Sequence, residues 1–181
     1  MRTARLLVIA ALIAACTWST AEAQHPQNRD GFWIGLGMGY GTMGLSCDVC
    51  DDVGREGGLS GYFKIGGTLA PNLLLGAETT GWTKSEGGAT VTQGNASAAL
   101  YWYPAVASGF FMKGGLGWSV LSLDSGFGDS SDSGFGLLGG VGYDMRLGRN
   151  VSVTPVLNYF RGGFEGGSTN VVQLGAGVTF H

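Results

Sequence analysis

Large apolar residues alternate with glycine over residues 32–40. From Phe32 to Tyr40 every even position is large and apolar, whereas Gly35, Gly37 and Gly39 occupy odd positions. A period of two predicts a β-strand, because successive side chains of a strand point to opposite faces. One face of this strand is therefore apolar and the other is nearly empty, which suits a narrow interior.

Seven further segments alternate in the same way. The predicted strands are residues 32–40, 59–69, 73–83, 90–103, 109–123, 134–147, 151–160 and 170–181. Long connections follow every odd-numbered strand, at 41–58, 84–89, 124–133 and 161–169, and short turns follow the others. The strands are long enough to cross a bilayer at a tilt, and a sheet in lipid must close on itself to leave no unpaired edge. Residues 31–181 are therefore predicted to form an all-β, eight-stranded, antiparallel up-and-down transmembrane β-barrel with short periplasmic turns and longer outer loops.

The two faces of these strands differ as a membrane barrel requires. The apolar face carries aromatic residues near the strand ends, as expected for interfacial girdles: Phe32, Tyr40, Trp102, Phe110, Trp118, Phe135, Tyr159 and Phe180. An eight-stranded barrel has room inside only for side chains. The lumen is therefore expected to be filled and not to conduct.

Five charged residues share the inner face. They are Lys64, Glu78, Lys113, Asp144 and Arg146. Counting from the turns places Lys64 opposite Glu78 and Lys113 opposite Asp144. Opposite charges on neighbouring strands can pair, and unpaired charges in a poorly hydrated lumen are costly. The set predicts a lumen charge network with a structural role, and a path for protons or ions is the alternative.

The N-terminus has the features of an export signal. A basic start precedes an apolar run from Leu6 to Ala15, and Ala21-Glu22-Ala23 is a small-x-small cleavage site. Residues 1–23 are therefore predicted to be a signal peptide and residues 24–30 a periplasmic N-terminal segment. In the competing interpretation, residues 13–16 form a lipoprotein box and Cys16 is lipidated.

Composition and cysteine spacing narrow the chemistry further. Charged residues make up 13% of the chain and the formal net charge is −3, so nucleic acid is not an expected partner. Cys47 and Cys50 lie in the longest predicted outer loop, and in an exported protein they are expected to form a disulfide. A metal site or haem attachment would need further ligands that are missing nearby, so no cofactor and no metal are expected.

The whole region resembles the small outer-membrane β-barrel family typified by the OmpA transmembrane domain and the OmpX-like adhesins. The most specific part of the resemblance is the last strand, where Gln173, Gly175, Val178 and Phe180 look like the C-terminal signal that the barrel insertion machinery reads. The resemblance implies a bacterial outer-membrane location, with outer-membrane lipid and the insertion machinery as partners.

The expected role is structural or surface-interacting and adhesin-like, carried by the outer loops and an extracellular surface partner. Catalysis is not expected: the only histidines, His25 and His181, are both predicted on the periplasmic side, far from the outer rim where lipid A-modifying barrels act. A narrow pore and a soluble lipocalin-like barrel with an apolar ligand are the alternatives. A lipocalin would place residues such as Leu36, Phe63, Leu116 and Val141 inside the barrel and leave Lys64 or Arg146 in water.

Overall fold

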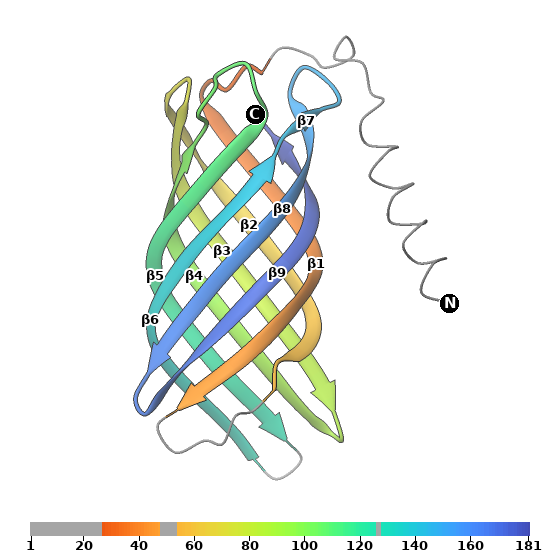
Figure 1. Ribbon diagram of the computed structural model, residues 1–181, viewed down its shortest axis with the longest axis vertical. Coiled ribbons are helices and arrows are strands. Elements are labelled where there is room, and N and C mark those ends of the chain that lie inside the picture. Colours follow the sequence, from red (N-terminus) through yellow and green to blue (C-terminus); the bar gives the residue numbers. More distant parts are fainter. Residues whose placement is uncertain (1–26, 48–53, 126–127) are drawn as a thin grey trace, which may run out of the picture.

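The strands form one antiparallel sheet that closes into a barrel. A computed structural model describes residues 27–47, 54–125 and 128–181. The strands in these ranges are β1 (Phe32–Cys47), β2 (Glu56–Ala70), β3 (Leu73–Glu86), β4 (Ala89–Trp102), β5 (Phe110–Ser125), β6 (Gly128–Tyr143), β7 (Met145–Arg146), β8 (Val151–Phe164) and β9 (Gly167–Phe180). Consecutive strands from β1 to β6 pair with each other, and so do β8 and β9. β1 pairs with β9, and β6 pairs with β8, which closes the ring (Figure 1).

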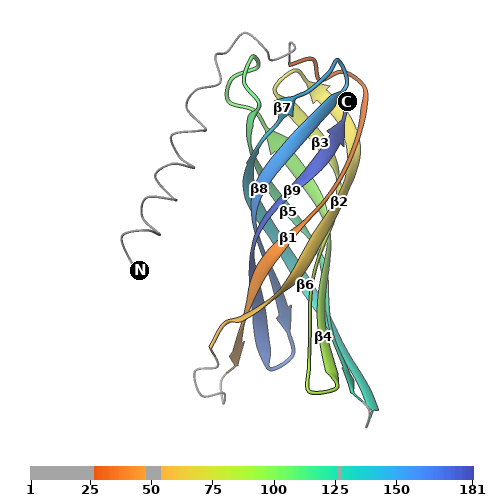
Figure 2. The same cartoon turned by 90° about the vertical axis from the view of Figure 1, so that its right-hand side faces the viewer.

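The predicted eight-stranded barrel is confirmed, since β7 is a two-residue continuation of β6 on the same side of β8. Asp144 separates the two pieces, and its backbone N–H bonds instead to the Gly109 carbonyl at 2.9 Å. Both described chain ends lie at the end of the barrel with the short turns (Figure 2). This is the periplasmic end by the general rule for outer-membrane barrels.

The apolar face points outward. Leu36, Phe63 and Leu116 are 56%, 41% and 59% exposed, whereas Lys64 and Arg146 are each 2% exposed. A water-soluble carrier needs the opposite arrangement, so the lipocalin-like alternative is wrong. Within the described residues, no helix is long and apolar enough to cross a membrane.

All eight aromatic residues expected on the apolar face are exposed on the exterior. Phe32, Trp102, Phe110 and Phe180 stand at strand ends on the periplasmic side and form the periplasmic aromatic ring. Tyr40, Trp118, Phe135 and Tyr159 form the outer aromatic ring, and Trp118 and Phe135 are direct partners across β5 and β6. The apolar band that contacts lipid lies between these two rings.

The strands continue well beyond the outer aromatic ring, which the sequence reasoning did not predict. The segments 84–89, 124–133 and 161–169 are not open loops: most of their residues pair across tight hairpins. Gly87 and Gly88 turn the β3–β4 hairpin with φ values of 61° and 84°. Outside hydrocarbon both faces of a strand can be polar, so the alternation disappears although the backbone pairing continues.

The register of these extended hairpins confirms one predicted pairing of charged residues and contradicts the other. Lys64 lies opposite Glu78, as the count from the β2–β3 turn predicts. Lys113, however, lies opposite Gly140 and not Asp144. The β5–β6 pairing runs up to Ser125 and Gly128, so the hairpin turns earlier along the chain than the centre of segment 124–133 and the register shifts with it.

Candidate functional site

A buried ion pair lies at the centre of the lumen. The Lys113 ammonium contacts one oxygen of the Glu78 carboxylate, and the Tyr101 hydroxyl donates to the other. The Lys113 and Glu78 side chains are 1% and 0% exposed. They come from β5 and β3, so the pair bridges over β4 inside the barrel and ties three neighbouring strands together.

Lys64 lies opposite Glu78 in the sheet but does not pair with it. Within the described ranges no carboxylate lies within 4 Å of the Lys64 ammonium. The ammonium lies instead among three rings, 5.2 Å from the centroid of Phe111, 5.5 Å from Tyr101 and 5.8 Å from Trp33. Aromatic faces attract cations, so the rings replace a carboxylate as the environment of this charge.

A second polar cluster surrounds Asp144 near the periplasmic mouth. Thr154 donates its hydroxyl to one carboxylate oxygen at 2.7 Å and Tyr103 donates to the other at 2.8 Å. His181 Nε2 lies 3.6 Å from the same carboxylate. Asp144 is fully buried, and these contacts connect β8 and the end of β9 with the segment that follows β4.

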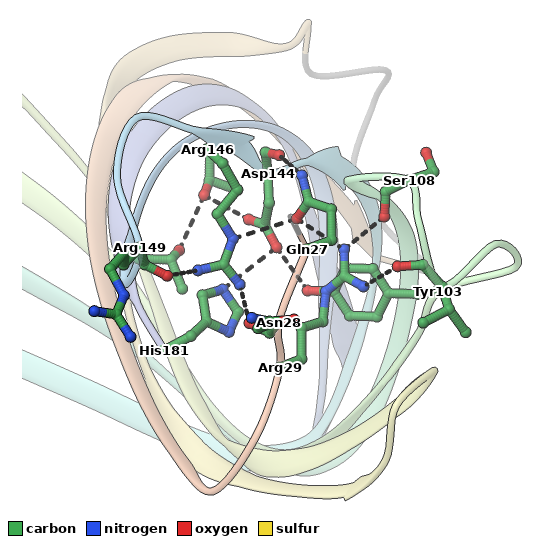
Figure 3. Close-up of polar contacts among 12 residues, drawn as sticks. Gln27, Asn28, Arg29, Tyr103, Ser108, Asp144, Arg146, Arg149 and His181 are labelled. Atoms are coloured by element: carbon green, nitrogen blue, oxygen red, sulfur yellow. Dashed lines mark hydrogen bonds and ion pairs between the residues drawn. The ribbon is translucent and has the colours of Figure 1, made fainter. Parts of the chain in front are cut away.

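The residues that precede β1 fold into this mouth. Gln27, Asn28 and Arg29, here called the N-terminal strap, cross the periplasmic end of the barrel (Figure 3). The Arg29 guanidinium lies 3.6 Å from the centroid of the Tyr103 ring, and it donates to the carbonyls of Val106 at 3.0 Å and Ser108 at 2.5 Å. Arg29 is 2% exposed although it lies in a segment without regular structure.

Arg146 holds the strap from the opposite wall. Its guanidinium donates to the Asn28 carbonyl, to Gln27 Oε1 at 3.3 Å and to the Arg149 carbonyl at 3.2 Å. Gln27 in turn donates to the Asp144 carbonyl at 3.2 Å. The strap, Arg146 and the Asp144 cluster therefore form one hydrogen-bonded closure of the periplasmic mouth.

The strap was not predicted from the sequence. Residues 24–30 were expected to be a periplasmic N-terminal segment, and Arg29 was not among the candidate residues. A cation directly before the first strand was a usable signal, because charged residues are few in this chain. Its carbonyl partners in the turn after β4 could not be found without the fold.

We expect Arg146→Ala to release the strap and to expose the Arg29–Asp30 bond to trypsin. The change removes three hydrogen bonds that hold Gln27, Asn28 and the Arg149 carbonyl. The measurement is mass spectrometry of a timed digest, in which the peptide ending at Arg29 should appear earlier than in the unmodified protein. Arg149→Ala is the control, because the Arg149 side chain is exposed and only its carbonyl is used; equal cleavage in both variants contradicts the strap.

The outer end of the barrel is polar and acidic. Lys84 bonds to Glu56 and Glu86, each at 2.5 Å. The hydrogen bonds to Glu56 and Glu86 raise the pKa of Lys84, and the bond from Lys84 lowers the pKa of Glu86. On the strand extensions, exposed carboxylates outnumber cations. The carboxylates are Glu56, Glu86, Asp124, Asp129, Asp132 and Glu165, and the cations are Arg55, Lys84 and Arg161.

Comparison with known proteins identifies the family. The sequence model for the outer membrane protein beta-barrel domain matches residues 8–180. This chain is a member of the outer membrane protein β-barrel family. It is therefore a protein of the bacterial outer membrane, and its apolar exterior between the two aromatic rings is the surface that faces lipid.

Solved structures show the same fold at low sequence identity. Ail, the attachment invasion locus protein of Yersinia pestis, in complex with the heparin analogue sucrose octasulfate, is 13% identical, with 83% of this chain and 99% of that chain covered and a TM-score of 0.61. Neisserial surface protein A is 21% identical, with 83% and 97% covered and a TM-score of 0.58. No curated protein matches the sequence.

The remaining candidate residues of this family member lie along β9 and at the end of β1. Gln173 is buried in the lumen and Phe180 faces outward at the end of β9, with Gly175 and Val178 between them. Their recognition by the insertion machinery remains a prediction. Cys47 ends β1 and Cys50 lies outside the described residues, so the disulfide also remains a prediction. In the described ranges no three His, Cys, Asp or Glu residues gather as a metal site.

Proposed function

We propose that this outer-membrane barrel is a closed, non-enzymatic anchor whose outer strand extensions bind a surface partner, in an adhesin-like role. The observation that supports this most is the contrast between the two parts of the molecule. The lumen is occupied by the strap, an aromatic layer and the Lys113–Glu78 pair, whereas polar paired strands continue past the outer aromatic ring. The extensions are then the part that meets molecules outside the cell.

The charge of the outer end favours a cationic partner. Six exposed carboxylates against three cations give these extensions a negative potential, which attracts positive surfaces and repels anions. Ail was crystallised with a sulfated ligand. The acidic extensions of this chain are unsuited to such an anion, so a basic protein or peptide surface is the partner class that we propose.

The test shortens the β5–β6 hairpin above the outer aromatic ring. Ala89–Gln93 at the outer end of β4 lose their partners on β5 but keep those on β3. Replacing residues 121–132 with Asn-Gly leaves Val120 opposite Ser133, which are already direct partners, and supplies a two-residue turn that suits a hairpin. The change removes Asp124, Asp129 and Asp132. We expect bacteria that carry this variant to adhere several-fold less to a polylysine-coated surface, with unchanged heat-modifiable migration on gels as the control for folding.

Two results would contradict the proposal. Equal adhesion of the shortened and unmodified proteins would remove the role of the extension, and stronger binding to immobilised heparin than to polylysine would reverse the partner class. Planar-bilayer recordings provide an independent check of the closed lumen, because stable single-channel openings by the unmodified protein would favour the pore instead.

A further inference from the structure

A small cup opens at the outer mouth of the lumen, where β1 to β4 extend past the outer aromatic ring. Its volume is about 210 Å³. Trp82, which is 2% exposed, forms the floor, and the half-buried side chains of Met43, Ala89 and Val91 form the walls. This volume is below the ~300–1,000 Å³ of sites for drug-sized ligands, so the cup suits a single side chain.

The apolar lining of the cup is confined to the mouth of the lumen. At the level of the floor the inward-facing side turns polar, because Ser60 and Gln93 are the buried direct partners of Trp82 on its two sides. Met43 and Val91 pack against buried apolar residues but remain only half-buried themselves. They face the inside of the barrel, so lipid cannot cover them. Apolar surface that is open to water and rimmed by polar residues favours contact with a partner.

The rim of the cup is charged, and its carboxylates outnumber its cations. Lys84 lies between Glu56 and Glu86 and bonds to both carboxylates at 2.5 Å. One lysine neutralises only one of the two negative charges. The Glu56 and Glu86 side chains are still 52% and 76% exposed, so they can accept further contacts from outside. A partner that brings a cation to the rim would balance the remaining charge.

We propose that the cup receives one apolar side chain of a basic partner segment, with lysine or arginine residues beside that side chain contacting Glu56 and Glu86. The order of groups from floor to rim supports this assignment. A cation that entered the cup would lie against the apolar walls, away from the carboxylates, and would lose its hydration there. An apolar side chain flanked by cations instead buries its carbon atoms at Trp82 and keeps its charges at the rim.

The partner class is therefore a cationic segment with an apolar anchor, as in a short amphipathic peptide. This inference rests on the proposed function and narrows it, because a basic surface without such an anchor would leave the cup unfilled. The cup is separate from the part of the outer end that the adhesion test removes, since Asp124, Asp129 and Asp132 do not line it.

The test compares two peptides that differ only in the anchor, Gly-Lys-Leu-Lys-Gly and Gly-Lys-Gly-Lys-Gly, each labelled at the N-terminus and amidated at the C-terminus. Their affinity for the detergent-solubilised protein is measured by fluorescence anisotropy at low and at moderate salt. We expect the leucine peptide to bind about tenfold more tightly, because only its side chain is buried in the cup. Added salt should weaken both peptides through their shared charges and leave the ratio of the two affinities unchanged.

Ala89→Phe fills the cup from its wall and leaves the charged rim intact. We expect this variant to bind the leucine peptide only as tightly as the glycine peptide. Ala96→Phe is the matched control, because Ala96 is on the same strand but is exposed on the outer face of the barrel. The control also accounts for entry of the leucine peptide into detergent. Val91→Phe is a second way to fill the cup if Ala89→Phe does not show the heat-modifiable migration of a folded barrel.

A preference for the leucine peptide that is lost in a filled cup and kept in Ala96→Phe supports the site. Equal binding of the two peptides by the unmodified protein overturns the apolar anchor and leaves the basic partner in place. Persistence of the preference in the filled cup, or no binding of either peptide, overturns the site as well. Adhesion to polylysine then decides separately whether the proposed function also fails.

Discussion

Replacing Glu78 by glutamine is expected to destabilise the barrel by about 3–5 kcal/mol, the usual cost of leaving one partner of a buried ion pair uncompensated. The Glu78 carboxylate is the only one that contacts Lys113 among the described residues, and neither side chain reaches water. The loss also leaves the Tyr101 hydroxyl with a weaker acceptor. The measurement is the free energy of unfolding in urea, followed by tryptophan fluorescence in micelles.

The double variant Glu78→Gln/Lys113→Met tests whether the loss comes from the unpaired charge. Removing both charges avoids a buried lone cation, so the double variant is expected to recover most of the stability that Glu78→Gln loses. Lys84→Met is a matched control at the partly exposed outer end, where an ion pair contributes little. Similar losses in the single and double variants would show that the charge of Lys113 is not what makes Glu78 important.

The contacts of the Glu78 carboxylate explain why Lys64 does not form an ion pair with it. Glu78 is opposite Lys64 in the sheet, but its oxygens are already taken by Lys113 and Tyr101. The lumen holds more cations than carboxylates, so one lysine must find another environment. The rings of Trp33, Tyr101 and Phe111 supply it.

The fold could be predicted from the sequence because the lipid-facing surface leaves a strong pattern. Alternation from Phe32 to Tyr40 and in the later strands reports which face meets hydrocarbon, and that information sufficed for strand number, closure and orientation. The pattern ends where the hydrocarbon ends. The extensions above the outer aromatic ring carry serine, aspartate and glycine on both faces, so nothing in their periodicity distinguished paired strand from loop.

The site was predictable only as a set of residues. The alternation of side chains along each strand identified which charged residues face inward. Their partners, however, depend on the register between strands and on how far each side chain extends across the lumen. An earlier hairpin turn moved Lys113 away from Asp144, and Lys113 then reached past β4 to Glu78. The strap depends on contacts of Arg29 with residues of a turn about 80 positions later, which no local pattern encodes.

Gly66→Ala is expected to destabilise the barrel by about 3 kcal/mol or more, at the upper end of the usual cost of overpacking. Gly66 and Gly76 are direct partners that face the lumen under the Trp33 ring. A Cβ at Gly66 would lie 2.6 Å from both the Trp33 ring and the Gly76 Cα, and closer still to the Leu75 carbonyl oxygen. Backbone atoms of a closed barrel cannot move away without disturbing the ladder.

Gly94→Ala is the matched control, because Gly94 is also a strand glycine but a Cβ there would meet nothing within 4 Å. Both variants are measured by urea unfolding and by heat-modifiable migration. A large loss for Gly66→Ala together with little change for Gly94→Ala would show that the inner glycines are required by the Trp33 packing, and not by a general need for glycine in these strands. Equal effects would contradict that explanation, since the two positions differ mainly in what lies above the missing Cβ.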